Sequence, residues 1–197
     1  MGLSKKTWKQ IGYETKDFLK FYRQSLDYIL KLNIKGRLLI ERGLFYSLKK
    51  ILNKEDPAYM EMRSPCGAAI GQMAFDYDGK IYTCDEGRMA SRMGKNDFKI
   101  GNVNNSYRQL IDNETTKITC LASILENHPS CNDCPYKPYC GTCPVINFVE
   151  YNTIFPILPL TMRCQINQAM FDYIFLKLKN IKYKKVFENW LDTNKII

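Results

Sequence analysis

Four cysteines lie close together in the segment SCNDCPYKPYCGTCPV, residues 130–145. Their spacing is C-x2-C-x5-C-x2-C, formed by Cys131, Cys134, Cys140 and Cys143. A two-residue spacer lets both thiolates of a pair face the same ion or cluster. The prolines between and after these cysteines limit the freedom of the backbone before a metal binds. The segment therefore predicts a metal site.

Zinc and an iron-sulfur cluster compete for such a site. Zinc patterns commonly separate two CxxC pairs by roughly 12 to 20 residues, whereas five residues separate the pairs here. The Cys-Pro steps at Cys134 and Cys143 are typical of ferredoxin ligand runs. Local spacing favours iron-sulfur. The alternative is a zinc-stabilised binding module for nucleic acid or an acidic peptide.

Three further cysteines extend the pattern. Cys66 and Cys84 flank a hairpin signal in the arrangement C-x12-G-x4-C, with Gly79 at the turn. Cys164 follows Cys143 after a spacer of twenty residues, at the predicted start of a helix. One zinc ion takes four ligands and does not need seven cysteines. The number of cysteines indicates two clusters.

Helices and one hairpin must position these thiols. Asp78-Gly79 between two apolar runs is a strong hairpin signal and predicts strands at about 70–77 and 80–84. Helical periodicity, with glycine and proline stops, predicts six helices at about residues 16–34, 38–52, 106–112, 115–126, 164–179 and 183–194. The fold class is α+β: a small β-hairpin and a cysteine-rich loop region binding iron-sulfur clusters, flanked by N- and C-terminal α-helices.

Charge and cysteine usage limit the partners and the compartment. The net charge of +9 comes from lysines and arginines scattered along the chain without a dense block, so nucleic acid is an unfavoured partner. The opening residues MGLSKKTWKQ lack the apolar run of a secretion signal. No apolar run approaches the roughly 20 residues of a membrane span, and paired thiols are typical of a reducing compartment. We expect a cytoplasmic protein without a membrane partner.

The full cysteine pattern resembles the seven-cysteine signature of the SPASM domain, the C-terminal auxiliary domain of radical S-adenosylmethionine (SAM) enzymes that modify peptides. The phrases YDGKIYTCD and FKIGNV resemble its hairpin and following strand, and the resemblance covers about residues 65–175. Within the group, PCGAAIGQMAFDYDGKIYTCDEGRM is most similar to maturases of the His-Xaa-Ser repeat peptide system.

The resemblance implies two auxiliary [4Fe-4S] clusters with interleaved ligands. Cys66, Cys84 and Cys143 would serve the first cluster. The second would take Cys131, Cys134, Cys140 and Cys164. It also implies three parts: residues 1–60 as a helical segment resembling the last part of a radical SAM barrel, residues 61–180 as the SPASM-like domain, and residues 181–197 as a C-terminal helix. The implied role is electron transfer or anchoring of a precursor peptide.

Individual side chains near the cysteines have two interpretations each. Asp85 matches an aspartate that is proposed as the catalytic base in sulfatase maturases, and its alternative is a surface carboxylate; Glu86 could substitute for it. Cys120 stands outside the signature and is interpreted as a buried helix thiol. His128, the only histidine, is interpreted as a plain loop residue, because the thiolate sets are already complete.

Three departures from the family matter. The last pair in the loop has a two-residue spacer where three is usual, and residues 1–65 contain no cysteine to supply the upstream fourth ligand of the first cluster. That fourth position is left open, taken by substrate or a carboxylate, or taken by Cys120.

The sequence also lacks the CxxxCxxC motif that binds the SAM-cleaving cluster. The chain thus resembles the C-terminal portion of such an enzyme, as a fragment, a truncated reading frame or half of a split system. S-adenosylmethionine would act only through a missing radical SAM core or one on a separate chain.

Overall fold

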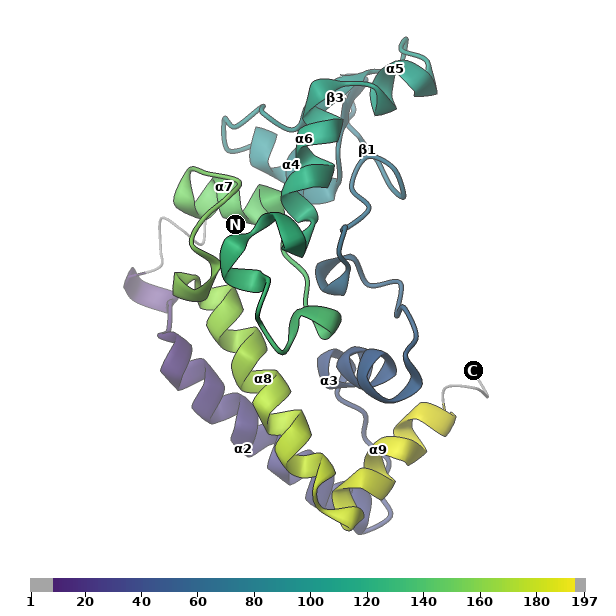
Figure 1. Ribbon diagram of the computed structural model, residues 1–197, viewed down its shortest axis with the longest axis vertical. Coiled ribbons are helices and arrows are strands. Elements are labelled where there is room, and N and C mark those ends of the chain that lie inside the picture. Colours follow the sequence, from purple (N-terminus) through teal and green to yellow (C-terminus); the bar gives the residue numbers. More distant parts are fainter. Residues whose placement is uncertain (1–8, 194–197) are drawn as a thin grey trace. The chain divides into compact units, whose positions relative to one another are not determined.

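The computed structural model describes residues 9–193, which divide into two compact units (Figure 1). The first unit contains residues 9–12 and Met60–Leu158, and the second contains Tyr13–Tyr59 and the described residues from Pro159 onward. Residues 1–8 of the predicted N-terminal part and 194–197 of the predicted C-terminal helix lie outside the described residues.

The first unit is built on a three-stranded antiparallel sheet in the order β1-β2-β3. Strands β1 (Ala74–Phe75) and β2 (Lys80–Tyr82) pair with Ala74 opposite Tyr82, and β3 (Lys99–Asn102) pairs with the other edge of β2. The Asp78-Gly79 turn joins β1 and β2 as predicted, with Gly79 at a φ of +79° that favours glycine.

The first strand is shorter than the predicted 70–77. Residues before β1 form a tight turn instead, in which the Gly71 N–H donates to the Gly67 carbonyl at 2.7 Å. Gly67 and Ala69 both adopt positive φ, which a regular strand does not allow. The apolar residues of this stretch therefore enter the core from a turn.

Helices surround the sheet of the first unit. They are α4 (Asp85–Ser91), α5 (Tyr107–Ile111), α6 (Glu114–Ser123) and α7 (Pro144–Tyr151), with 3-10 turns at Met60–Met62, Leu125–Asn127, Pro129–Cys131 and Lys137–Tyr139. Ser106 and Gln109 form a capping box that starts α5, and Asn113 caps α6 by accepting from the Thr115 N–H at 2.8 Å. The sequence prediction covered α5 and α6 but did not include α4 and α7.

The core of the first unit includes two groups of buried side chains. One lies between the sheet, α5 and the turn before β1, and contains Ala69, Ile81, Ile100 and Leu110 with Met73 at its edge. Through Leu110 this group anchors α5 to the sheet. The other group holds two of the cysteines and is described below.

The second unit is entirely helical. Its elements are α2 (Thr15–Ile34), α3 (Arg42–Leu48) with a π-helical turn (Lys49–Asn53), α8 (Met162–Leu178) and α9 (Ile181–Thr193), and a 3-10 turn at Leu158–Leu160 stands at the boundary between the units. Leu26, Leu44 and Trp190 are almost completely buried. The Trp190 Nε1–H donates to Asn33 Oδ1 at 2.9 Å, which joins α9 to α2.

The second unit differs from the predicted division of the chain. That division assigned residues up to 180 to the cysteine-rich domain, but residues from Pro159 onward pack with Tyr13–Tyr59. The reason is that α8 packs against both α2 and α3, and Tyr173 on α8 donates to Asp27 Oδ1 on α2 at 2.9 Å. The predicted α+β class is confirmed by the sheet and its surrounding helices.

Within residues 9–193, none of the helices has both the length and the apolar character that crossing a membrane requires.

Candidate iron-sulfur site

Three thiols from distant parts of the sequence come together in the first unit. Cys66 and Cys84 are 7% and 3% exposed and belong to one buried cluster, and Cys143 packs against it. Cys66 precedes the turn before β1, Cys84 follows β2 and Cys143 precedes α7. These are the three residues that the SPASM resemblance assigns to the first cluster, so the fold assembles the predicted set.

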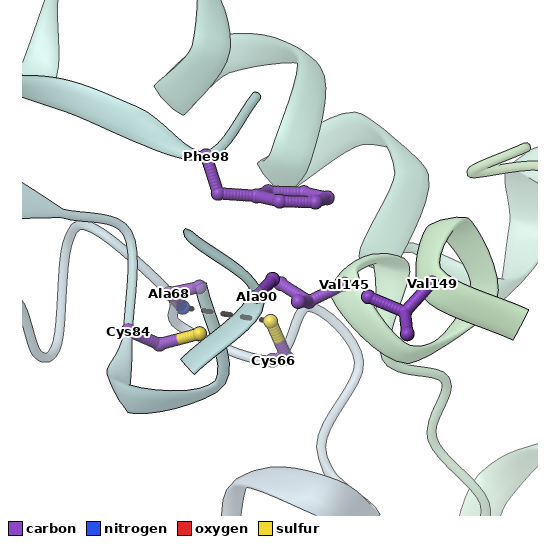
Figure 2. Close-up of a cluster of buried hydrophobic side chains, with 7 residues drawn as sticks. All are labelled: Cys66, Ala68, Cys84, Ala90, Phe98, Val145 and Val149. Carbon is purple, nitrogen blue, oxygen red and sulfur yellow. Dashed lines mark hydrogen bonds between the residues drawn. The ribbon is translucent and has the colours of Figure 1, made fainter. Parts of the chain in front are cut away.

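The surroundings of this first group are apolar. The cluster is completed by side chains from the turn before β1, from the residue before β3, and from α4 and α7: Ala68, Phe98, Ala90, Val145 and Val149 (Figure 2). Figure 2 shows the sulfur atoms of Cys66 and Cys84 pointing toward one another. Buried apolar surroundings of this kind exclude water, which strengthens every electrostatic contact within them.

Backbone N–H groups point at both buried thiols. The Ala68 N–H donates to Cys66 Sγ at 3.5 Å, and the Gly87 N–H donates to Cys84 Sγ at 3.4 Å. Cys84 is the N-cap residue of α4, and its thiol satisfies an N–H of the first turn. Such N–H groups stabilise a sulfur that carries negative charge, as a cluster ligand does.

Without a metal, Cys84 holds its proton firmly. Burial is the largest of the effects that together raise the pKa of this thiol to about 12. The charges of Glu86 and Cys143 act in the same direction, and the hydrogen bond from the Gly87 N–H acts against them. Because a metal ligand must be the thiolate, a bound cluster would replace this proton and neutralise the buried charge.

A second group of thiols lies in the loop between α6 and α7. The Cys134 N–H donates to the Cys131 carbonyl at 3.2 Å, that of Lys137 to the Cys134 carbonyl at 3.1 Å, and that of Cys140 to the Lys137 carbonyl at 3.3 Å. Successive bonds of this i to i+3 kind place residues three apart on one side of the backbone. The pKa of Cys131 is raised by burial, then by the charges of Cys140 and Cys134, so these three thiols are electrostatic neighbours.

Cys164, the predicted fourth ligand of the second group, lies in the second unit. It stands in the first turn of α8, where its N–H donates to Oγ1 of the N-cap Thr161 at 3.2 Å. Its role in the second cluster stays a prediction. No disulfide joins any of the eight cysteines, all of which lie within the described residues.

Thiols are the natural ligands of iron-sulfur clusters, and both groups consist of thiols alone. Among residues 9–193, no set of three or more His, Cys, Asp and Glu side chains is arranged to hold a single metal ion. The donor set and the apolar pocket around the first group fit a cluster ligated by cysteines.

Asp85, the predicted base, lies at the start of α4 rather than at a free hairpin end. Its carboxylate is exposed and forms an ion pair with Arg88 at 2.6 Å. The first turn of a helix favours a carboxylate in this position. Its catalytic role stays a prediction.

His128 and Cys120 have contacts that sequence reasoning did not anticipate. His128 is 2% exposed, its Nε2 lies 2.9 Å from the Ala122 carbonyl, and its ring packs on Phe155. It lies outside the helices, as interpreted, but it is a buried structural residue that closes the end of α6 rather than a plain loop side chain. Cys120 lies on α6 beside the Cys66 segment, only partly buried, with its Sγ at 3.8 Å from the Ala68 carbonyl.

Residues 66–135 match the family model of SPASM, described as an iron-sulfur cluster-binding domain. No curated protein matches the sequence. Among solved structures, the chain is similar to one of native anSMEcpe with bound AdoMet, with 20% identity and a TM-score of 0.63, covering 87% of this chain and 44% of that one.

Two further structures of anSMEcpe give the same result. The hexahistidine-tagged form with bound AdoMet has 19% identity and a TM-score of 0.65, covering 93% of this chain and 46% of that one. The native form with AdoMet and the Kp18Cys peptide has 18% identity and a TM-score of 0.59, covering 89% and 45%. The chain thus shares the fold of part of these proteins and spans less than half of their length.

Proposed function

We propose that this chain is the auxiliary cluster-binding part of a radical SAM/SPASM enzyme that modifies a peptide after translation. Cys66, Cys84 and Cys143 hold one [4Fe-4S] cluster in this proposal. The other is held by Cys131, Cys134, Cys140 and Cys164. The single observation that carries it is the meeting of three thiols from distant segments, two inside one buried apolar cluster and Cys143 packed against it.

The match of residues 66–135 to the SPASM iron-sulfur domain supports the cluster chemistry. The structures of similar fold hold AdoMet and, in two cases, a bound peptide, which supports a peptide as the substrate. When bound, the clusters supply one-electron transfer. The protein supplies the ligating thiols, the N–H groups that point at them and a pocket that excludes water.

The chain acts in this proposal with a radical SAM core that carries the CxxxCxxC motif, on a separate chain or in a longer protein. The partner substrate is a precursor peptide, and the compartment is the reducing cytoplasm, where thiols stay available for metal. Asp85 takes a proton from the peptide, because its carboxylate is exposed at the start of α4 next to ligand Cys84.

Anaerobic reconstitution followed by iron, sulfide and zinc analysis tests the proposal. Two four-iron clusters give about eight irons and about eight sulfides per chain and a brown protein. A colourless protein that holds one or two zinc ions and no sulfide would contradict it. That result would favour the zinc-stabilised binding module.

A further inference from the structure

The first thiol group contains three of the four ligands that a [4Fe-4S] cluster requires. Residues 1–65 contain no cysteine, so they supply no upstream thiol. Cys120 is the one cysteine outside the seven-cysteine pattern.

Cys120 and Cys66 contact the two backbone polar groups of a single residue. Cys120 Sγ donates to the Ala68 carbonyl at 3.8 Å, and the Ala68 N–H donates to Cys66 Sγ at 3.5 Å. Both thiols therefore lie around Ala68, which itself belongs to the buried cluster with Cys66 and Cys84. Cys120 reaches this place from α6, fifty-two residues away in sequence from Ala68.

A serine hydroxyl fixes the backbones that carry these two thiols. Ser123 Oγ accepts from the Cys66 N–H at 3.1 Å and donates to the Cys120 carbonyl at 2.8 Å. Ser123 is fully buried, so the bridge is shielded from water. The last turn of α6 is held against the Cys66 segment by this bridge and by the Cys120 contact.

The same helix also packs on the element that follows Cys143. Helix α6 contacts α7, and Cys143 is the N-cap residue of α7. Cys120 is thus carried by a helix that touches the segments of two first-group ligands, Cys66 and Cys143.

Resting on the proposed function, we propose that Cys120 is the fourth thiolate of the first cluster. Each iron of that cluster then carries a protein thiolate. Because no iron has an open coordination position, the peptide does not bind to this cluster. The cluster carries electrons and stabilises the fold. The chain replaces an upstream ligand with one from α6.

Iron loss on mild oxidation tests the assignment. A cubane iron that lacks a protein thiolate is the first to leave, which converts a four-iron cluster into a three-iron cluster. We expect the wild-type protein to keep about eight irons and Cys120→Ala to fall to about seven, with the EPR signal of a three-iron cluster. In Cys120→Ser an oxygen ligand keeps the iron and shifts the reduction potential of one cluster.

Leu121→Ala is the matched control, because Leu121 is the next residue on α6 and is 54% exposed. It should keep the wild-type iron content and oxidation behaviour. If Cys120→Ala and the wild-type protein lose the same amount of iron at the same rate, the assignment of Cys120 is wrong, but the proposal of two clusters is unaffected. If wild type binds neither iron nor sulfide, the proposed function itself fails.

Alkylation of the wild-type protein gives a second measurement that needs no substitution. Iodoacetamide is applied to the loaded and the metal-free protein, and modification of Cys120 is followed by mass spectrometry. Ligation should slow modification of Cys120 by roughly tenfold or more in the loaded protein, because a metal-bound thiolate is not a free nucleophile. Equal rates in the two forms would overturn the assignment.

Discussion

Cys66 and Cys84 meet in one buried cluster although they stand at opposite ends of the hairpin segment (Figure 2). Both sulfurs accept a backbone N–H, from Ala68 and Gly87 respectively. The hairpin and the turn before it thus bring together two of the thiols that we propose as ligands of the first cluster.

Replacing both Cys66 and Cys84 with alanine leaves too few thiols to hold the first cluster and should remove it while leaving the second. We expect iron to fall from about eight to about four per chain, because the second set draws on other cysteines. Anaerobic reconstitution with iron and sulfide analysis measures this. Thr83→Val is the neighbouring control, since it removes the hydroxyl at 3.8 Å from Cys84 Sγ but no thiol.

Loss of the second cluster should likewise leave the first cluster in place. Replacing both Cys131 and Cys134 with alanine should lose the second cluster and keep about four irons in the first. A loss of all iron from either variant would show that the clusters load only together, and would contradict two separately held sites.

Cluster removal should loosen the loop between α6 and α7 more than the sheet. The loop is held by short 3-10 turns with no buried side chains at Pro129–Cys131 and Lys137–Tyr139, whereas β2 is buried at Ile81 and Tyr82. Regions with few buried contacts open first. Hydrogen exchange of the loaded and chelator-treated protein should show faster exchange at residues 129–143 and little change in β2. Uniform exchange across both regions would contradict this.

Gly141 stands where only a glycine fits. A Cβ there would lie 2.7 Å from the carbonyl oxygens of both Glu61 and Arg63, closer than atoms can approach. Gly141→Ala should therefore push the loop away from residues 61–63 and cost about 1 to 3 kcal/mol of unfolding free energy. Urea unfolding of the metal-free protein measures it.

Gly71→Ala is the control for this change. Its Cβ would meet nothing closer than the Gly67 carbonyl at 3.4 Å, an ordinary contact. We expect a change within about 0.5 kcal/mol. Equal costs for the two variants would mean that the contact with residues 61–63 does not limit the position of the loop.

Sequence reasoning predicted the elements whose signals are local. The periodicity of residues 16–34 corresponds to α2, and Asp78-Gly79 marks the hairpin turn. Helix α4 was not predicted because its N-cap is Cys84, a residue type that is not a usual cap and that had been assigned to ligation alone. Helix α7 begins at Pro144, which had been interpreted only as a restraint on the loop.

The site was partly predictable for a similar reason. Spacing indicated a metal-binding role for the cysteines and the family resemblance divided them into two sets, of which the structure brings Cys66, Cys84 and Cys143 together. The place of Cys120 could not be predicted, since it depends on how α6 packs on a segment more than fifty residues earlier, which Ser123 and Ala68 determine. The burial of His128 could not be predicted from its neighbours in the sequence, because it depends on contacts with the Phe155 ring and the Ala122 carbonyl.

Alkaline pH should destabilise the helical unit through Tyr22. Its hydroxyl donates to Glu41 Oε2 at 2.6 Å, and the same carboxylate caps α3 by accepting from the Gly43 and Leu44 N–H groups. Burial, followed by the hydrogen bond and the charge of Glu41, raises the pKa of Tyr22 far above its ordinary value of 10.0. The folded state thus keeps this proton at a pH where the unfolded state loses it.

The sign of the effect follows from proton binding. Below about pH 10 both states hold the proton and the contribution of Tyr22 is fully present; above it the unfolded state binds fewer protons, so the unfolding free energy falls as pH rises. The slope from one such group approaches about 1.4 kcal/mol per pH unit. Tyr22→Phe should reduce the slope and cost about 0.5 to 1.5 kcal/mol at neutral pH, where the hydrogen bond is lost.

Urea unfolding of the metal-free protein between about pH 8 and pH 11 measures both effects. Tyr28→Phe is the control, because Tyr28 lies on the same helix and is 62% exposed. It should keep the wild-type slope, and the background from other ionising groups is common to all three proteins. If the slope of Tyr22→Phe equals that of Tyr28→Phe, the Tyr22–Glu41 contact does not hold the proton, and the cap of α3 is independent of Tyr22.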